Sequence, residues 1–277
     1  MIIWLASYPK SGNTWVRLFL NSLIFTTDVT VNINNIKLGQ FPIRRYFKDL
    51  TSNIDDVKEF IQNCNHAQSK INLDNKIKFF KTHNALWKIG EHCFTNDENT
   101  KGIIHIVRDP RNVITSIKNH YNYESYEEAF DFMNDENKII GIKGSTNEED
   151  LPTPISSWKQ HYNSWKNLVN FKSEYILIKY EDLLKDPINE FTKITSFIEK
   201  ISDTRFIEKN ILKSIENTKF DNLREQEEIN GFKEGPKNSN KFFNLGPQND
   251  WKNLLDKNMK NKIEICFKTE MQDLGYL

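Results

Sequence analysis

A lysine, a serine, a glycine and an asparagine lie close together in the short segment Tyr8–Trp15 (YPKSGNTW). An apolar run, Ile2–Ala6, precedes this segment, and apolar positions with helical spacing follow it as far as Leu23. A loop that joins a strand to a helix directs several backbone N–H groups at one point, where the helix dipole also favours negative charge. Lys10 adds a full positive charge. The segment is therefore a candidate anion-binding loop, and the alternative is an ordinary turn with a solvated lysine.

The order of residues in this loop differs from that of the phosphate-binding loop of nucleotide hydrolases. In that loop, GxxxxGK followed by Ser or Thr, the lysine comes after a second glycine. Here Lys10 precedes the only glycine of the segment, Gly12. Thr14 is expected to act as a cap near the start of the following helix.

A second strand, loop and helix carries an arginine and a serine that suit a phosphate. The apolar run Ile103–Val107 predicts a buried strand, and Asn112–Tyr121 has the spacing of a helix. Arg108 ends the strand and offers a planar fork of donors, while the hydroxyl of Ser116 adds one more. The alternative is a salt bridge from Arg108 to Asp109 or to another acid.

A histidine and a lysine stand at the end of a third predicted strand. Ile77, Phe79 and Phe80 indicate a short strand that ends at Lys81–His83 (KTH). Active-site groups of open α/β sheets lie beyond the carboxyl ends of the strands, which is where His83 is expected. A lone histidine is nevertheless more often structural than catalytic.

Composition narrows the class of protein. The 277 residues contain 38 Lys plus Arg and 38 Asp plus Glu, so no overall field attracts nucleic acid or an anionic membrane. Three dispersed cysteines fit a reducing compartment rather than a disulfide framework or a cysteine metal site. No apolar run is long enough to span a membrane, and the first strand leaves no room for a signal peptide. We expect a cytoplasmic protein.

Periodicity predicts the remaining elements. One further strand is expected over Glu174–Tyr180. In the helix over Ser156–Leu168, the aromatic stripe through Trp158, His161, Tyr162 and Trp165 is interpreted as core. Other helices are expected over Asp55–Asn63, Tyr126–Met133, Pro187–Lys200, Ile207–Arg224 and Asp256–Leu274. The polar segments Thr26–Asn75 and Glu124–Thr153 carry no motif. The first either shapes a binding pocket or packs against the sheet edge, and the second either covers such a pocket or is a plain surface insertion.

Several of these segments resemble the cytosolic-type sulfotransferases, which use 3'-phosphoadenosine 5'-phosphosulfate (PAPS). YPKSGNTW is similar to the family's sulfate-donor loop, usually PKSGTTW, with Asn13 in place of one threonine. The KTH segment resembles the one that carries the family's catalytic histidine. The spacing from Arg108 to Ser116 agrees with the motif that binds the 3'-phosphate of PAPS.

The resemblance continues to the end of the chain, with some departures. Tyr180, in YEDL, matches a tyrosine near the adenine. Thr218 and Phe220 match residues that contact the purine, while Lys219 replaces a serine between them. The terminal signature agrees at Phe242, Gly246, Asp250, Trp251 and Lys252. It departs where Asn244 and Leu245 replace an arginine and a lysine, and where Asn249 replaces a glycine.

What the resemblance implies is a single α/β domain over residues 1–277, with a central, mainly parallel sheet flanked by helices and a P-loop-like topology. The implied reaction is the in-line transfer of a sulfonate from PAPS to a hydroxyl or amine, with release of the bisphosphate product, PAP, and without a metal ion. His83, Lys10 and Lys81 are the implied catalytic residues. The implied PAPS-binding residues are Lys10, Ser11, Gly12, Asn13, Thr14, Trp15, Arg108, Ser116, Tyr180, Thr218, Phe220, Phe243, Asn244 and Gly246.

Two alternatives stay open at this point. The first is a nucleotide kinase, which would bind ATP with magnesium. The second is a PAPS- or PAP-binding protein with impaired turnover, suggested by the loss of two basic residues at Asn244 and Leu245. Lys241 and Lys237 are the candidates to compensate for that loss. The sequence does not identify the acceptor, which is a small molecule, a lipid or a glycan, and it leaves the oligomeric state undetermined.

Overall fold

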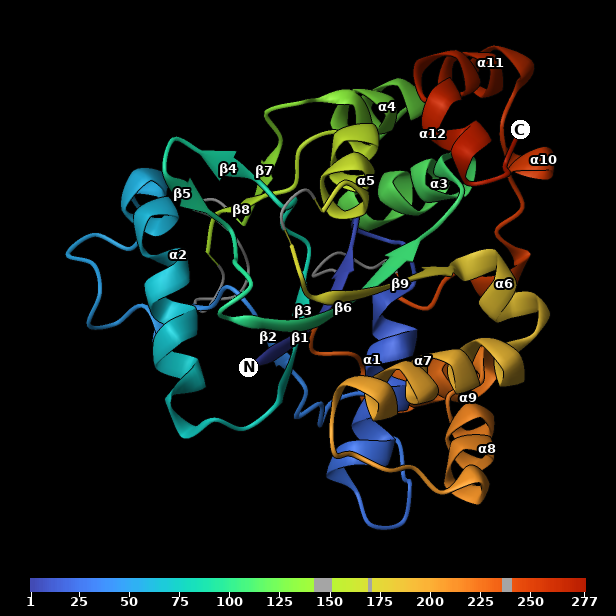
Figure 1. Ribbon diagram of the computed structural model, residues 1–277. Coiled ribbons are helices and arrows are strands. Elements are labelled where there is room, and N and C mark those ends of the chain that lie inside the picture. Colours follow the sequence, from blue (N-terminus) through green and yellow to red (C-terminus); the bar gives the residue numbers. More distant parts are fainter. Residues whose placement is uncertain (142–150, 169–170, 236–240) are drawn as a thin grey trace. The chain divides into compact units, whose positions relative to one another are not determined.

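The computed structural model describes residues 1–141, 151–168, 171–235 and 241–277 (Figure 1). Its contacts divide the chain into two compact units. The first comprises Met1–Tyr8, Gly39–His105 and Asn134–Leu177. The second comprises Pro9–Leu38, Ile106–Met133 and Ile178–Leu277. The expectation that residues 1–277 form one domain stays a prediction.

A five-stranded sheet is the centre of the first unit (Figure 1). Its order is β2-β3-β1-β6-β9. The strands are β1 (Ile2–Ser7), β2 (Gly39–Gln40), β3 (Lys78–Thr82), β6 (Thr100–Val107) and β9 (Glu174–Lys179), and the last two residues of β6 and of β9 belong to the second unit. β3 pairs in parallel with both β1 and β2. All six residues of β1 are buried, as its continuous apolar run predicts. The expected α/β class with a parallel sheet is confirmed.

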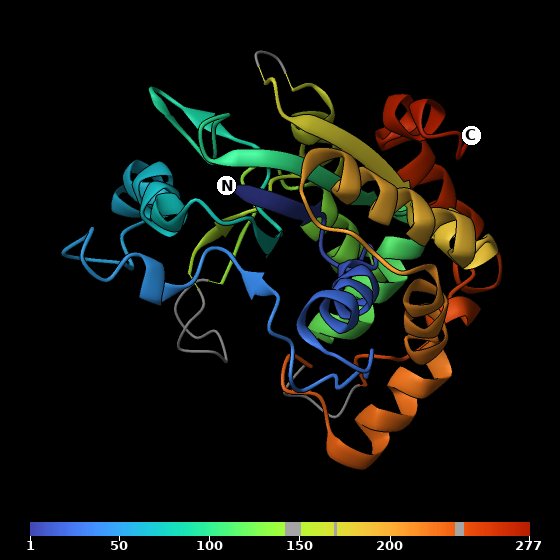
Figure 2. The same cartoon turned by 60° about the horizontal axis from the view of Figure 1, so that its bottom comes forward.

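Aromatic side chains fill the core on one side of this sheet. The Trp4 ring lies 5.1 Å from Phe94 and 5.7 Å from Phe41 between centroids. The helix α2 (Val57–Ile71) adds Phe60 and Cys64 to the same cluster. Figure 2 shows this helix, coloured light blue to cyan, from a second side. It begins one residue after Asp56, whose side chain accepts the Lys58 N–H. It is longer than the predicted helix over Asp55–Asn63 because its buried face continues through two further turns.

The rest of the first unit is small. The helix α5 (Trp158–Lys166) begins after its cap, Ser157, and buries the whole predicted aromatic stripe. That part of the prediction is confirmed. The short elements are η1 (Arg44–Tyr46), η2 (Asn72–Asp74), and the strand pairs β4 (Lys88–Ile89) with β5 (His92–Cys93) and β7 (Ile139–Ile140) with β8 (Thr153–Pro154).

Helices make up most of the second unit. They are α1 (Asn13–Phe25), α3 (Pro110–Tyr121), α4 (Tyr126–Asn134), α6 (Tyr180–Lys185), α7 (Pro187–Ile201), α8 (Glu208–Asn217), α9 (Phe220–Asn230), η3 (Gly246–Gln248), α10 (Trp251–Leu254), α11 (Lys257–Cys266) and α12 (Lys268–Asp273). The terminal residue of α4, Asn134, falls in the first unit. Tyr180 begins α6 instead of ending β9 as predicted.

Two helices that the sequence predicts as continuous are each broken in two. The prediction over Ile207–Arg224 is wrong because Lys219 adopts an extended backbone (φ −55°, ψ 144°), so that Phe220 starts a new helix. The prediction over Asp256–Leu274 is wrong at Phe267, whose φ of −112° and ψ of 22° leave the helical range. In the second case the break keeps the apolar face inside, because Met259, Ile263, Phe267, Met271 and Leu274 are all buried.

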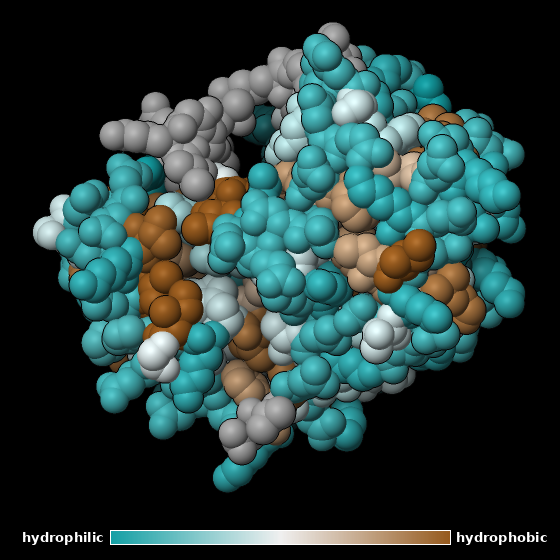
Figure 3. Space-filling model, turned by 90° about the horizontal axis from the view of Figure 1, so that it is seen from above, coloured by the Kyte–Doolittle hydropathy of each residue, from teal (hydrophilic) through white to brown (hydrophobic). Residues whose placement is uncertain are grey.

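The face of the molecule in Figure 3 is mostly hydrophilic, with separate groups of hydrophobic residues. Within the described residues, none of the helices has both the length and the apolar character needed to cross a membrane.

Candidate active site

The loop between β1 and α1 depends on glycine at one position. Gly12 is the N-cap of α1 and has φ +95°, a backbone conformation that side chains disfavour. A Cβ atom placed on Gly12 would lie 2.4 Å from Cδ2 of Tyr180, so the aromatic ring also fills the space. The expectation that Thr14 caps the helix is wrong, because Thr14 lies inside the first turn. The N–H of Trp15 already donates to the Gly12 carbonyl (3.1 Å).

Arg108 lies beside this loop within the second unit. Its Nη1 donates to the carbonyl of Lys10 (3.1 Å) and to Oγ of Ser116 (3.3 Å). Its guanidinium carbon is 4.2 Å from the centre of the Tyr180 ring. The loop, Arg108 and Ser116 are thus brought together, as the sequence predicts.

Arg108 is a buried cation, 6% exposed, and it forms no ion pair with any described residue. The salt bridge to Asp109 considered above does not form, because Asp109 pairs with Arg111 instead, at 2.7 Å. A buried charge without a partner is costly. An anionic ligand at this place would remove that cost.

Three buried polar atoms at the site lack a hydrogen-bond partner in the described part of the chain. They are Oγ of Ser11, Nε1 of Trp15 and Nε of Arg108. Buried polar groups are nearly always hydrogen-bonded, so a polar ligand that reached these atoms would satisfy them. Two of the three are obligate donors. The residues present therefore fit a ligand that carries a phosphate or a sulfate.

The terminal signature is held in place by a carboxylate that the sequence analysis missed. Glu227, on α9, accepts the N–H groups of Phe242 (2.7 Å) and Phe243 (2.8 Å). The Phe242 ring lies 3.9 Å from Nζ of Lys10, which has a positive φ of 66°. Phe243 is buried in a small hydrophobic cluster, and Asn244 is exposed. Glu227 lies three residues beyond the predicted helix over Ile207–Arg224, and nothing in its local sequence indicates that it binds backbone 15 residues later.

Aromatic rings line two parts of the second unit. The Trp15 and Tyr180 rings meet edge to face, 6.1 Å apart. Phe220 lies against Gly246, where an added Cβ would approach the ring to 2.3 Å. Thr218, the other residue predicted to contact the purine, is fully buried, and its hydroxyl donates to the Ser214 carbonyl (2.7 Å). A purine would reach Thr218 only after the chain rearranged.

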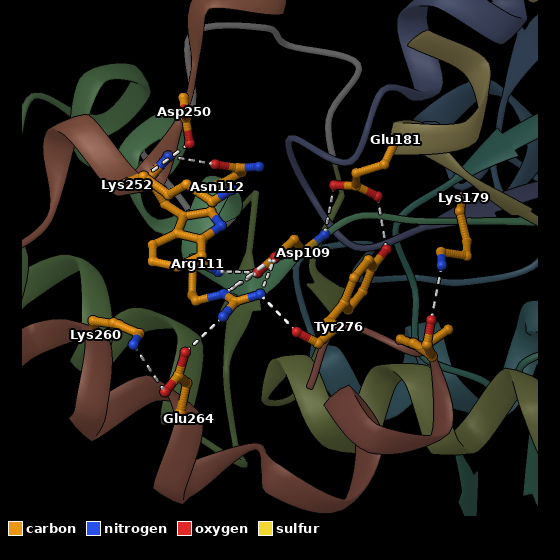
Figure 4. A network of polar contacts seen from close by, with 12 residues as sticks. Asp109, Arg111, Asn112, Lys179, Glu181, Asp250, Lys252, Lys260, Glu264 and Tyr276 are labelled. Carbon is orange, nitrogen blue, oxygen red and sulfur yellow. Dashed lines mark hydrogen bonds and ion pairs between the residues drawn. The ribbon is translucent and has the colours of Figure 1, made fainter. Parts of the chain in front are cut away.

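A buried polar network fixes the end of β6 next to Arg108 (Figure 4). Asp109 caps α3 and holds Arg111, whose Nη1 also reaches Glu264 (2.6 Å) and whose Nη2 reaches the Tyr276 carbonyl (2.9 Å). Glu181 accepts the Asp109 N–H (3.0 Å) and the Tyr276 hydroxyl (2.8 Å). Burial raises the pKa of Glu181 above its ordinary value, although these hydrogen bonds lower it. The network makes the backbone that carries Arg108 rigid.

His83 follows β3 directly, in the first unit. Its Nδ1 lies 2.8 Å from the carbonyl oxygen of Ser7 and 3.3 Å from the Ser7 hydroxyl. A carbonyl only accepts, so Nδ1 carries the proton of the neutral ring and Nε2 carries the lone pair. Lys81, two residues earlier, donates from Nζ to Oε1 of Gln40 (3.5 Å). The position of His83 at a strand end agrees with the prediction.

Two other histidines of the first unit are buried and have lowered pKa values. Burial lowers the pKa of His161 to about 3, and its ring meets Tyr8 edge to face at 5.6 Å. Burial lowers the pKa of His105 well below its ordinary value, and the electrostatic effect of His161 lowers it further. Nδ1 of His105 is hydrogen-bonded to the Tyr175 hydroxyl (2.9 Å). Both rings are therefore neutral at pH 7. Among the described residues, no group of His, Cys, Asp or Glu is arranged to hold a metal ion.

Comparison with known proteins gives a consistent match over the chain. The family model described as the sulfotransferase domain matches residues 2–275. Sulfotransferase 1B1 of the dog is 23% identical over an alignment of 286 positions, which covers 97% of this chain and 83% of the relative. The amine sulfotransferase of the rabbit is 23% identical over 98% of this chain and 81% of its own. The flavonol 3-sulfotransferase of Flaveria bidentis is 22% identical over 99% of this chain and 82% of its own.

Solved structures share the fold. Mouse sulfotransferase SULT7A1, complexed with PAP, has a TM-score of 0.60 and 20% identity, over 99% of this chain and 85% of its own. Retinol dehydratase, in complex with androsterone and the inactive cofactor PAP, has a TM-score of 0.60 and 17% identity, over 98% of this chain and 81% of its own.

Proposed function

Because this chain belongs to the sulfotransferase domain family, we propose that it transfers a sulfonate from PAPS to a hydroxyl or amine and releases PAP. One structural observation carries the proposal. Arg108 is buried without an ion pair among the described residues, next to unpartnered donors of the loop and of Trp15. A negatively charged ligand would stabilise the buried guanidinium at such a site. PAP in two structural neighbours supports this choice of ligand.

The proposed binding roles follow from these contacts. Loop residues hold the 5'-phosphosulfate through backbone N–H groups and through the side chains of Ser11 and Thr14. Arg108 and Ser116 bind the 3'-phosphate, which distinguishes PAPS from an ordinary adenine nucleotide. The remaining residues of the site, namely Gly12, Asn13, Trp15, Tyr180, Phe220, Phe243, Asn244 and Gly246, shape the loop, the adenine wall and the terminal segment.

The proposed chemistry is an in-line displacement at sulfur. The acceptor's oxygen or nitrogen forms a bond to sulfur while the bond from sulfur to the bridging oxygen breaks and leaves its electron pair on PAP. Lys10 neutralises the charge that develops on that oxygen, and Lys81 adds positive charge. Nε2 of His83 takes the acceptor's proton. A sulfonate carries less charge than a terminal phosphoryl group, so we propose that no metal ion is needed.

One observation favours a second candidate, a binding protein that has lost turnover. Asn244 and Leu245 stand where the family resemblance places two basic residues. Lys241, considered above as a substitute, is paired with Glu228 at 2.5 Å and so does not supply the missing charge in this arrangement. Lys237, the other substitute, lies outside the described residues. The kinase alternative is set aside because the family model describes sulfotransferases.

The acceptor is proposed to be a small molecule, since relatives are named for amines and flavonols. Lipids and glycans are included among the acceptors tested in the experiment described below. We place the protein in the cytoplasm on the basis of its three cysteines, which are all free thiols.

Transfer of radiolabelled sulfonate from PAPS to a panel of phenols, amines, flavonols, sterols and glycans tests the proposal. We expect transfer by the wild-type protein and none by His83→Ala, with unchanged affinity for PAP. His66→Ala, an exposed histidine on α2, is the matched control and retains activity. Full activity of His83→Ala would reject His83 as the base. Tight PAP binding without transfer to any acceptor would favour the binding protein.

A further inference from the structure

One of the residues that depart from the family resemblance in the terminal signature, Asn249, is in contact with the proposed phosphate site. Asn249 stands where the resemblance places a glycine, and a glycine has no side chain to offer. Here the side chain is almost fully buried, 6% exposed, and lies against the helix α3. Each of its polar atoms has a partner among the described residues.

The orientation of this carboxamide is fixed by its neighbours. Nδ2 donates to the backbone carbonyl of Asn112 (2.9 Å), which only accepts, so the nitrogen must face that side. Oδ1 accepts the hydroxyl proton of Thr115. The second N–H of Nδ2 points at Oγ of Ser116, 3.0 Å away. The neighbouring backbone is fastened too, because the Trp251 N–H donates to Oδ1 of Asn112 (2.9 Å).

Two donors therefore converge on Ser116. Nδ2 of Asn249 reaches Oγ at 3.0 Å, and Nη1 of Arg108 reaches it at 3.3 Å. A hydroxyl has two lone pairs and one proton, so both acceptor positions are used. Its proton remains for an acceptor outside this set. Ser116 is partly exposed, so a ligand oxygen can be that acceptor.

We propose that Asn249 is a positioning residue that makes Ser116 a hydrogen-bond donor and thereby increases the preference for a nucleotide with a 3'-phosphate. This rests on the proposed function, in which Ser116 and Arg108 bind that phosphate. Without Asn249 the hydroxyl can rotate and must be ordered when the ligand binds. A fixed donor avoids that loss, which is the usual benefit of preorganisation.

Calorimetric titrations with PAP and with adenosine 5'-phosphate (AMP), which lacks the 3'-phosphate, test this role. We expect Asn249→Ala to weaken PAP binding by about tenfold and to leave AMP binding unchanged. Asn249→Asp should weaken PAP binding by about a hundredfold, because a carboxylate accepts the Ser116 proton and repels phosphate. A structural defect alone would lower the affinity for both nucleotides equally. Asn21→Ala, which removes another buried asparagine of the same unit, should leave the ratio of PAP to AMP affinity unchanged.

A double-mutant cycle shows whether the effect passes through Ser116. In a Ser116→Ala background, Asn249→Ala should cause no further loss of PAP affinity. If the Asn249 variants do not fold, Thr115→Val replaces them, since it removes one of the three hydrogen bonds that hold the Asn249 carboxamide. This substitution should also lower the preference for PAP. An unchanged preference in Asn249→Ala, or an equal loss with and without Ser116, would overturn the role of Asn249. Wild-type protein that binds PAP no more tightly than AMP would overturn the proposed function itself.

Discussion

Replacing Gly12 by alanine tests the geometry of the proposed donor loop. The substitution meets two separate obstacles. Its φ of +95° is unfavourable for a residue with a side chain, and the new methyl group would lie 2.4 Å from Cδ2 and 3.0 Å from Cε2 of Tyr180. Because Tyr180 lies under Arg108, any movement of its ring also disturbs the proposed phosphate site.

The two costs can be estimated separately. A positive φ costs roughly 1 to 2 kcal/mol for a residue with a Cβ, and overpacking a tight site costs about 1 to 3 kcal/mol. The free energy of unfolding should therefore fall by about 2 to 5 kcal/mol, which corresponds to a Tm lower by about 5 to 15 °C. Thermal unfolding followed by circular dichroism measures this, and titration with PAP should show a parallel loss of affinity.

Gly90→Ala is the matched control, because Gly90 has a positive φ of 62° but nothing within 4 Å of its added Cβ. It should show only the smaller, conformational cost. Combining Gly12→Ala with Tyr180→Ala should recover the packing cost, so the two effects should not add. If Gly12→Ala costs no more than Gly90→Ala, or if its effect adds to that of Tyr180→Ala, the described contact between loop and ring is refuted.

Three further predictions follow from buried charges and polar groups. Between pH 3 and 6.5 the free energy of unfolding should rise by about 1.4 kcal/mol per pH unit because of His161. Its pKa is about 3 in the folded protein, so only the unfolded chain takes up a proton in that range. Denaturation at several pH values measures this slope, and His161→Phe should flatten it. Arg108→Met should leave the unliganded protein as stable or more stable, because it removes a buried cation that has no ion pair among the described residues, but it should weaken PAP binding at least tenfold. A clear loss of stability would contradict this reasoning. Glu227→Ala should lower the free energy of unfolding by about 1 to 3 kcal/mol, because the N–H groups of Phe242 and Phe243 lose their acceptor. An unchanged thermal unfolding curve would contradict this role of Glu227.

Local patterns in the sequence were sufficient for the elements that carry the site. The apolar run of β1, the loop chemistry after it and the strand before His83 are short-range signals, and the structure has each of them in place. The contact of Arg108 with Ser116 was expected from the resemblance, whose 3'-phosphate motif has the same spacing.

The features that sequence reasoning missed depend on partners far along the chain or on local backbone detail. Asn249 meets Ser116 across 133 positions, and no residue pattern announces that contact. The helix break at Lys219 has neither proline nor glycine to mark it. Asp109 caps α3 and binds Arg111, and only the folded backbone shows that Arg108 therefore has no ion pair within the part of the chain that the structure describes.

Direct binding of the bisphosphate product tests the central claim most plainly. Calorimetric titration of the wild-type protein with PAP, beside ADP with magnesium, compares a ligand that has a 3'-phosphate with one that does not. The account predicts one site that binds PAP, with much weaker binding of ADP. Absence of heat with PAP, or equal binding of ADP with magnesium, would contradict it.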